Sequence, residues 1–283
     1  MKIMVTGSSG QLGSDLVPEL KKHNIEVIPA DIDTVDITDK SALEEFINKT
    51  EPDGVIHLAA YTAVDKAESE KELCTKINAL GTENLAEICG KKNIKILYIS
   101  TDYIFGGTGD EFIETDAPVN PCNHYGLTKL QGEESVKKYC SKYFIVRISW
   151  VFGVHGKNFV YTMLRLAESK DEITVVSDQI GSPTFTEDLS SLLCDIIKSD
   201  KYGTYHATNE GVCSWAEFAK EIMILSGKST KITPIKSDEY PTAAKRPFNS
   251  RLSKKSLDAA GFGRLPHWKD ALARFLKETG NLV

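Results

Sequence analysis

Near its N-terminus the chain reads Lys2-Ile3-Met4-Val5-Thr6-Gly7-Ser8-Ser9-Gly10-Gln11-Leu12-Gly13. The apolar run before Gly7 is typical of a buried parallel strand, and apolar residues recur at helical spacing over 11–23. The glycines suit a tight turn, a close approach of the backbone to a pyrophosphate, and close packing of helix and strand. The helix N-terminus would offer free N–H groups to that phosphate. This stretch predicts a strand–turn–helix unit for a dinucleotide, although its G-x-x-G-x-x-G spacing differs from the usual G-x-G-x-x-G.

Beyond this turn, apolar runs alternate with amphipathic stretches. We expect strands at 25–30, 54–60, 95–100 and 144–148, and helices at 40–50, 70–91 and 125–143. This alternation predicts an α/β fold with a doubly wound parallel sheet of the Rossmann type. It weakens after residue 153, so we expect a dinucleotide-binding domain over 1–153 and a smaller, mainly substrate-binding C-terminal region over 154–283. Within that region, residues 203–225 are expected to return to the main sheet.

A tyrosine and a lysine stand four positions apart in the run Tyr125-Gly126-Leu127-Thr128-Lys129. On a helix this spacing places the phenol and the ammonium on one face, where the ammonium would lower the pKa of the tyrosine. Such a phenol is a usable proton donor or acceptor. The pattern also arises by chance in many helices, so its meaning depends on the glycine turn. Together the two features predict hydride transfer between a nicotinamide and a carbonyl.

Two other residues stand at the ends of expected strands, where open α/β sheets bind their ligands. Thr101 follows the strand at 95–100 and is placed to contact a carbonyl. Asp31 follows the strand at 25–30, and its carboxylate would bind the ribose 2′-hydroxyl and repel a 2′-phosphate. Asp31 therefore favours NADH over NADPH, while a solvated aspartate in a turn is the alternative interpretation.

Composition excludes several classes of function. The 283 residues carry 26% charged side chains and a net charge of −6, without a basic block, which argues against a nucleic acid partner. No apolar run approaches the roughly 20 residues of a membrane span, and no signal peptide precedes the first strand. The six cysteines are scattered without C-x-x-C spacing. We therefore expect reduced thiols in a cytoplasmic protein and no zinc site.

Further runs carry a family resemblance across nearly the whole chain. They read AAYTAVDKAE at 59–68, STDYIF at 100–105, YGLTK at 125–129, RISWVFG at 147–153, DQIGSPT at 178–184 and RPFNSRL at 246–252. With the glycine turn, these runs resemble the extended short-chain dehydrogenase/reductases and, among them, the dTDP-4-dehydrorhamnose reductases. The runs at 63–68 and 246–250 are the specific ones, because the glycine turn and Tyr-x-x-x-Lys are shared by the whole superfamily.

The resemblance implies an oxidoreductase that converts dTDP-4-dehydro-L-rhamnose to dTDP-L-rhamnose, the last step of dTDP-rhamnose synthesis, with NADH, NADPH or both. The implied catalytic residues are Thr101, Tyr125 and Lys129. The residues expected to bind the cofactor are Gly7, Gly10, Gln11, Leu12, Gly13, Asp31, Asp36, Ile37, Ala59, Ala60, Tyr61, Thr62, Tyr125 and Lys129. Those expected to bind the sugar nucleotide are Thr101, Asp102, Tyr103, Trp150 and Arg246, with Arg246 at the diphosphate.

Other interpretations remain open at this point. A sugar-nucleotide epimerase or dehydratase would share the fold and the trio, and a non-catalytic NAD(P)-binding regulatory subunit or a plain NAD-binding scaffold would share the fold. Some relatives bind magnesium at a dimer interface through glutamates. Asp15 lies near one such place without a convincing set around it, so we predict no metal. A homodimer is an assembly that the resemblance allows, and a small molecule is the expected partner.

Overall fold

The main sheet lies at the centre of a computed structural model that describes residues 1–283. Its strands are β1 (Lys2–Thr6), β2 (Glu26–Ala30), β3 (Gly54–His57), β4 (Lys95–Thr101), β5 (Tyr143–Ile148) and β10 (Gly203–His206). All neighbours are parallel, in the order β10-β5-β4-β3-β1-β2. The order runs outward from β1 in both directions, so the predicted doubly wound Rossmann sheet is confirmed. Its switch point lies between β1 and β3, where such sheets bind their ligands.

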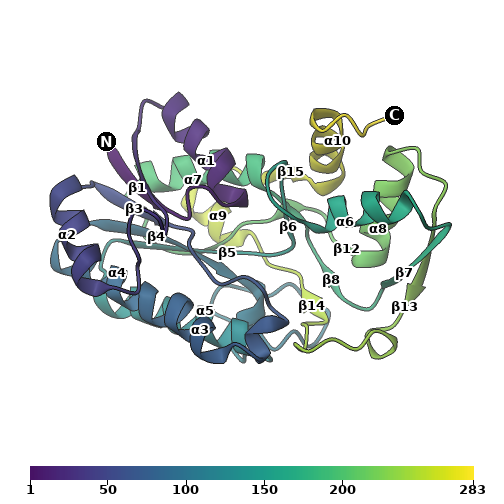
Figure 1. Cartoon of the computed structure of the whole chain (residues 1–283), viewed down its shortest axis with the longest axis horizontal. Helices are drawn as coiled ribbons and strands as arrows, with labels where there is room; N and C mark the ends of the chain where they lie inside the picture. Colours follow the sequence, from purple (N-terminus) through teal and green to yellow (C-terminus); the bar gives the residue numbers. More distant parts are fainter.

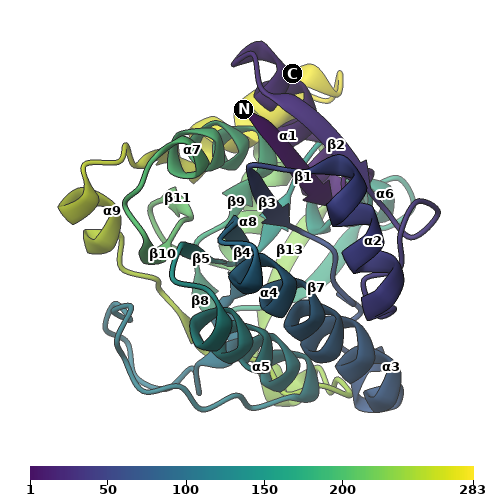
Figure 2. The same ribbon diagram turned by 90° about the vertical axis from the view of Figure 1, so that its left-hand side faces the viewer.

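Helices cover both faces of this sheet (Figures 1 and 2). One face carries α1 (Gln11–Lys22), α7 (Thr186–Lys198) and α9 (Lys255–Ala260), whose buried side chains share one apolar cluster with the strands. The other face carries α2 (Lys40–Thr50), α4 (Thr82–Lys91) and α5 (His124–Tyr139), which share a second cluster. Because both faces are buried, the strands are apolar along most of their length, as the sequence predicted.

A smaller lobe stands beside the C-terminal ends of the strands, on the right in Figure 1. It contains α6 (Phe159–Ala167), α8 (Trp215–Leu225), α10 (Trp268–Glu278) and the parallel pair β7 (Glu172–Val176) and β13 (Lys231–Ile235). Its core is a separate apolar cluster centred on stacked and edge-on aromatic rings, among them Phe152, Phe218 and Phe275. A short three-stranded sheet, β12 (Cys213–Ser214), β8 (Ile180–Gly181) and β14 (Asn249–Ser250), completes it. No helix is both long and apolar enough to cross a bilayer.

The expected strands and helices are present, with four differences in their bounds. The strand expected over 54–60 ends at His57, and the helix expected over 125–143 ends at Tyr139. The helix expected over 70–91 is divided into α3 (Lys71–Thr75), a π-helical segment (Lys76–Gly81) and α4. Within the segment expected to return to the main sheet, β10 pairs with β5 whereas α8 packs in the core of the smaller lobe. The division of the chain at residue 153 stays a prediction.

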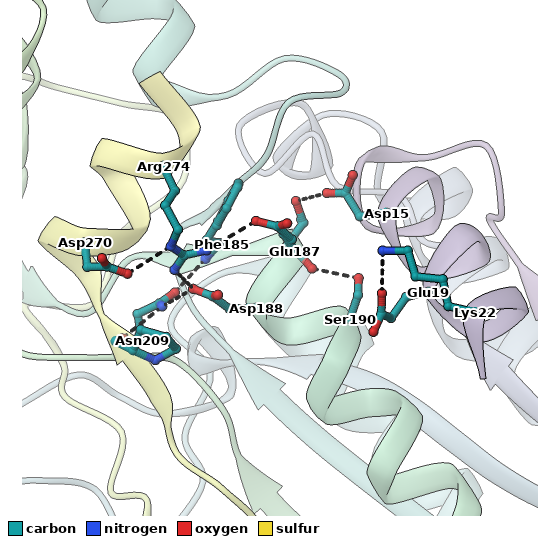
Figure 3. A network of polar contacts seen from close by, with 12 residues as sticks. Asp15, Glu19, Lys22, Phe185, Glu187, Asp188, Ser190, Asn209, Asp270 and Arg274 are labelled. Carbon is teal, nitrogen blue, oxygen red and sulfur yellow. Dashed lines mark hydrogen bonds and ion pairs between the residues drawn. The ribbon is translucent and has the colours of Figure 1, made fainter. Parts of the chain in front are cut away.

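A network of polar contacts links the smaller lobe to the first helix (Figure 3). Arg274 of α10 binds Asp188 at 2.8 Å and Glu187 at 3.2 Å, both in the first turn of α7. In the same turn the hydroxyl of Thr186 donates a hydrogen bond to Asp15 of α1. The position of α10 is thereby tied to the helix that follows the glycine turn.

Candidate active site

The glycine turn and the Tyr-x-x-x-Lys pair meet at one cavity of about 850 Å³, at the C-terminal ends of β1, β3 and β4. It is lined by thirteen of the fourteen residues expected to bind the cofactor: Gly7, Gly10, Gln11, Leu12, Gly13, Asp31, Asp36, Ile37, Ala59, Ala60, Thr62, Tyr125 and Lys129. Thr101, Asp102, Tyr103 and Trp150 line the same cavity, while Tyr61 and Arg246 do not. Residues separated by more than a hundred positions therefore enclose one space.

The glycine turn has the geometry of a phosphate-binding loop. Gly7 has φ +68°, and a Cβ there would lie 2.8 Å from the backbone nitrogen of Ala59, so only glycine fits without strain. A Cβ at Gly13 would lie 2.4 Å from the Gly7 carbonyl oxygen, because the helix starts directly against the turn. No side chain caps the N-terminus of α1 and its first turn holds no acidic residue. Its first N–H groups and the positive end of the helix dipole can therefore bind a pyrophosphate.

The far end of this cavity is acidic. Asp31 Oδ2 accepts hydrogen bonds from the Ser8 hydroxyl at 2.7 Å and from the Ser9 N–H at 3.1 Å, which fixes the carboxylate beside the glycine turn. Both bonds use one oxygen, so Oδ1 remains an acceptor for a ribose hydroxyl. Asp33 and Asp36 line the cavity as well, and a hydrogen bond from the Thr38 N–H lowers the pKa of Asp36.

Tyr61 lies outside the lining because its polar groups bind elsewhere. Its backbone N–H donates to Asn78 Oδ1 at 2.7 Å and its carbonyl accepts from Asn78 Nδ2 at 3.1 Å. Its hydroxyl donates to Glu70, which raises the pKa of Tyr61 to about 12. Asn78 is buried in the π-helical segment and also donates to Thr128 of α5. Sequence reasoning missed Asn78, because it lies in a π-helical segment, a feature frequent at functional sites that the sequence pattern did not reveal.

Tyr125 and Lys129 are placed by the start of α5. Asn123 caps the helix, with Oδ1 accepting from the Gly126 N–H at 2.8 Å. A Cβ at Gly126 would lie 2.1 Å from the Tyr103 carbonyl oxygen, so this glycine allows α5 to lie directly on the segment after β4. The rings of Tyr103 and Tyr125 then meet edge to face at 5.7 Å. These contacts place Tyr125 beside Thr101, the last residue of β4.

The electrostatics of the pair differ from the sequence expectation. Burial lowers the pKa of Lys129 to about 7, against opposing effects of Glu133 and Cys74, and its Nζ lies 4.0 Å from the centre of the Tyr98 ring. Burial raises the pKa of Tyr125 above its usual range, and the charge of Asp102 adds to this shift while Thr101 opposes it. The expectation that Lys129 would lower the pKa of Tyr125 is therefore wrong, because that pKa is raised overall. Desolvation of the phenolate is the larger effect.

Two stacked indoles connect the lining of this cavity with that of a second one of about 620 Å³. Trp150 lines the first cavity and Trp215 lines the second, and their rings are parallel within 15° at 3.8 Å. Trp150 has φ +50°, which is a strained conformation for a bulky side chain and is found mainly at functional sites. Trp215 could not have been singled out from the sequence, because tryptophans in helices are usually core residues.

Arg246 lies at the second cavity. Its guanidinium binds Asp65 through two hydrogen bonds of 3.1 and 2.7 Å and donates to the Ala244 carbonyl at 3.1 Å. Asp65 belongs to the specific run at 63–68 and Arg246 to the specific run at 246–250, so this ion pair joins the two. The remaining lining is largely apolar, with Phe159, Met163 and Val175 among its members.

A family model and several known proteins are similar to this chain over nearly its whole length. The family model described as "RmlD substrate binding domain" matches residues 1–281. A dTDP-4-dehydrorhamnose reductase from Clostridium acetobutylicum has a structure with a TM-score of 0.97 at 44% identity, covering 99% of this chain and 100% of that one. A dTDP-4-dehydrorhamnose reductase from Bacillus anthracis in complex with NADP reaches 0.95 at 42% identity, covering 98% and 99%.

A third relative has a name that refers to the spore coat. The spore coat polysaccharide biosynthesis protein SpsK of Bacillus subtilis is 40% identical over 277 residues, 98% of this chain and 97% of its own length. Full-length similarity at this level and the match of the family model agree with the architecture described above. The chain belongs to the RmlD substrate-binding-domain family of extended short-chain dehydrogenase/reductases.

Proposed function

We propose that this protein reduces dTDP-4-dehydro-L-rhamnose to dTDP-L-rhamnose with NADH or NADPH. The observation that carries the proposal is the single cavity that joins a phosphate-binding glycine turn to Thr101, Tyr125 and Lys129. The two reductases of known structure with the same architecture support the choice of substrate. When bound, the reduced nicotinamide would supply the hydride that reaches the C4 carbonyl carbon of the sugar.

Tyr125 is the proposed proton donor. In a reduction, the group that protonates the developing alkoxide must carry its proton before the step. A pKa raised by burial keeps the Tyr125 phenol protonated at neutral pH. As a general acid it would contribute on the order of 10²–10⁴-fold to the rate. The raised pKa thus suits the reductive direction.

Lys129 and Thr101 orient the reactants in this proposal. Lys129 is 4% exposed and borders the cavity, where its ammonium can donate to a ribose hydroxyl of the cofactor. Thr101 is 5% exposed and its hydroxyl lies at the end of β4, where it can contact the carbonyl oxygen of the sugar. Holding two reactants in contact can supply several kcal/mol of the barrier reduction.

The second cavity is the proposed site of the nucleoside. Its apolar lining and the face of Trp215 suit a planar base, and Gln179 and Lys245 provide polar contacts. The diphosphate would then lie between the two cavities, near Arg246. The hydrogen bonds of this guanidinium to Asp65 and Ala244 use Nη1 and Nη2, so its Nε–H remains free to donate. A guanidinium is suited to a diphosphate because it donates in a planar fork.

The acidic end of the first cavity supports a preference for NADH. Asp31, Asp33 and Asp36 line that end, and a 2′-phosphate would meet their negative charge. The Bacillus anthracis reductase was described with NADP, so both cofactors belong in the assay.

The deciding experiment follows the oxidation of NADH and NADPH with dTDP-4-dehydro-L-rhamnose. Stoichiometric release of oxidised cofactor together with dTDP-L-rhamnose is the expected result, and Tyr125→Phe is the matched inactive control. An epimerase or dehydratase would convert its sugar nucleotide without net oxidation of NADH. A regulatory subunit or scaffold would bind the cofactor without turnover, and either outcome would refute the proposal.

We also propose a cellular location and an assembly state for the protein. All six cysteines are free thiols, which is usual for proteins of a reducing compartment, and we propose the cytoplasm. A homodimer is proposed on the family resemblance alone, and light scattering of the purified protein would test it.

A further inference from the structure

A serine of the smaller lobe reaches the catalytic strand end. Ser250 of β14 donates a hydrogen bond from Oγ to Asp102 Oδ2 at 2.5 Å, and both residues are 2% exposed. The segment that carries Ser250 is fixed on both sides, since Asn249 N–H donates to the Gly107 carbonyl at 2.9 Å and β14 pairs with β8. Ser250 lies in the run at 246–252, for which the proposed function uses only Arg246.

The other oxygen of the same carboxylate holds the catalytic hydroxyl. Thr101 Oγ1 donates to Asp102 Oδ1 at 3.0 Å and accepts from the Tyr103 N–H at 3.2 Å. A hydroxyl has one proton, so the direction of the Thr101 O–H depends on how strongly Asp102 attracts it. Ser250, Asp102 and Thr101 therefore form one hydrogen-bonded chain that ends at the lining of the first cavity.

Burial makes this chain sensitive to the loss of a donor. Asp102 is enclosed, and desolvation raises its pKa to about 6 while the hydrogen bonds from Ser250 and Thr101 oppose that rise. Without Ser250, one buried carboxylate oxygen would lose its donor, which is costly in a protein interior. Asp102 would then rotate or take up a proton, and either change would alter the orientation of Thr101.

We propose that Ser250 is a positioning residue that acts through Asp102 on Thr101, so that the smaller lobe sets the orientation of the catalytic hydroxyl. This inference rests on the proposed reductase function. It assigns to the RPFNSRL run a second role, distinct from binding the diphosphate through Arg246. Because Ser250 has no place in the cofactor half of the cavity, its loss should affect turnover and leave cofactor binding unchanged.

The test measures kcat, the KM for the sugar nucleotide and the Kd for NADH in Ser250→Ala. A lost hydrogen bond to a charged group predicts at least a roughly tenfold fall in kcat, with the NADH Kd within about twofold. Ser250→Cys fills the site with a slightly larger group that donates weakly, so it should lose as much turnover as the alanine variant. Ser253→Ala is the matched control, because that serine is also buried and its hydroxyl accepts from the Lys255 N–H, at the first residue of α9, away from Asp102.

A double-mutant cycle separates this role from simple packing. In the Asp102→Asn background, Ser250→Ala should change kcat by less than about threefold, because Asp102, through which Ser250 acts, is already altered. Full turnover in Ser250→Ala, restored turnover in Ser250→Cys, or additive effects in the cycle would each overturn the inference. Wild-type protein is assayed in parallel. An inactive wild type would contradict the proposed reductase function, whereas an active wild type with full turnover in Ser250→Ala would contradict only the positioning role of Ser250.

Discussion

Replacing Arg246 by alanine should weaken binding of the sugar nucleotide without affecting the cofactor. The guanidinium is proposed to meet the diphosphate with charge-assisted hydrogen bonds, which contribute about 1.5–3 kcal/mol each. One such bond corresponds to roughly a 10- to 150-fold increase in KM for the sugar nucleotide. Arg246 lines the second cavity and not the first, so the KM for NADH should stay within about twofold.

The structure supplies a control that the sequence alone did not. Asp65 binds Arg246 at 2.7 Å and is 47% exposed, so water can solvate Asp65 after Arg246 is removed. If Arg246 serves the diphosphate, Asp65→Asn should change the sugar-nucleotide KM by less than about threefold. If the ion pair only anchors the segment at 240–248, the two substitutions should raise KM equally.

These effects are measured from initial rates of NADH oxidation at varied concentrations of the sugar nucleotide. The proteins compared are wild type, Arg246→Ala, Arg246→Lys and Asp65→Asn. Lysine should restore only part of the loss, because it provides a point charge in place of a planar fork. An unchanged KM in Arg246→Ala, or equal losses in Arg246→Ala and Asp65→Asn, would refute the assignment of the diphosphate to this residue.

Three other predictions concern the first cavity. Tyr125→Phe should lower kcat at least ~100-fold with NADH affinity within about twofold, and a variant that keeps a tenth of the turnover would exclude Tyr125 as the general acid. Asp31→Asn should raise the kcat/KM ratio of NADPH to NADH, and an unchanged ratio would show that Asp31 does not contact the ribose. Burial lowers the pKa of Lys129 from 10.5 to about 7, so the unfolded chain binds this proton more tightly and stability increases with pH across that window. Lys129→Met should therefore raise the free energy of unfolding by on the order of 4 kcal/mol at pH 7 and by about 1 kcal/mol near pH 10; urea unfolding giving equal gains at both values would contradict this.

Much of the fold and of the cofactor half of the cavity could be predicted because the signals are local. The turn at 7–13 and the pentapeptide at 125–129 each fit within one or two helical turns, where spacing alone sets which side chains share a face. The alternation of strands and helices then leaves few possible topologies. The π-helical segment at Lys76–Gly81 was not predicted, because its extra residue is stabilised by the contacts of Asn78 with Tyr61 and Thr128.

Residue spacing along the chain was enough to predict the glycine turn, the Tyr125/Lys129 pair and the acidic residue at the end of β2, since each depends on near neighbours. Three other features depend on tertiary packing: the pairing of Asp65 with Arg246, the contact of Ser250 with Asp102, and the raised pKa of Tyr125. The first two join segments that lie 181 and 148 positions apart. The third depends on how much water is excluded around the phenol. Contacts between distant segments and the exclusion of water both arise from packing, which the spacing of residues along a chain does not encode.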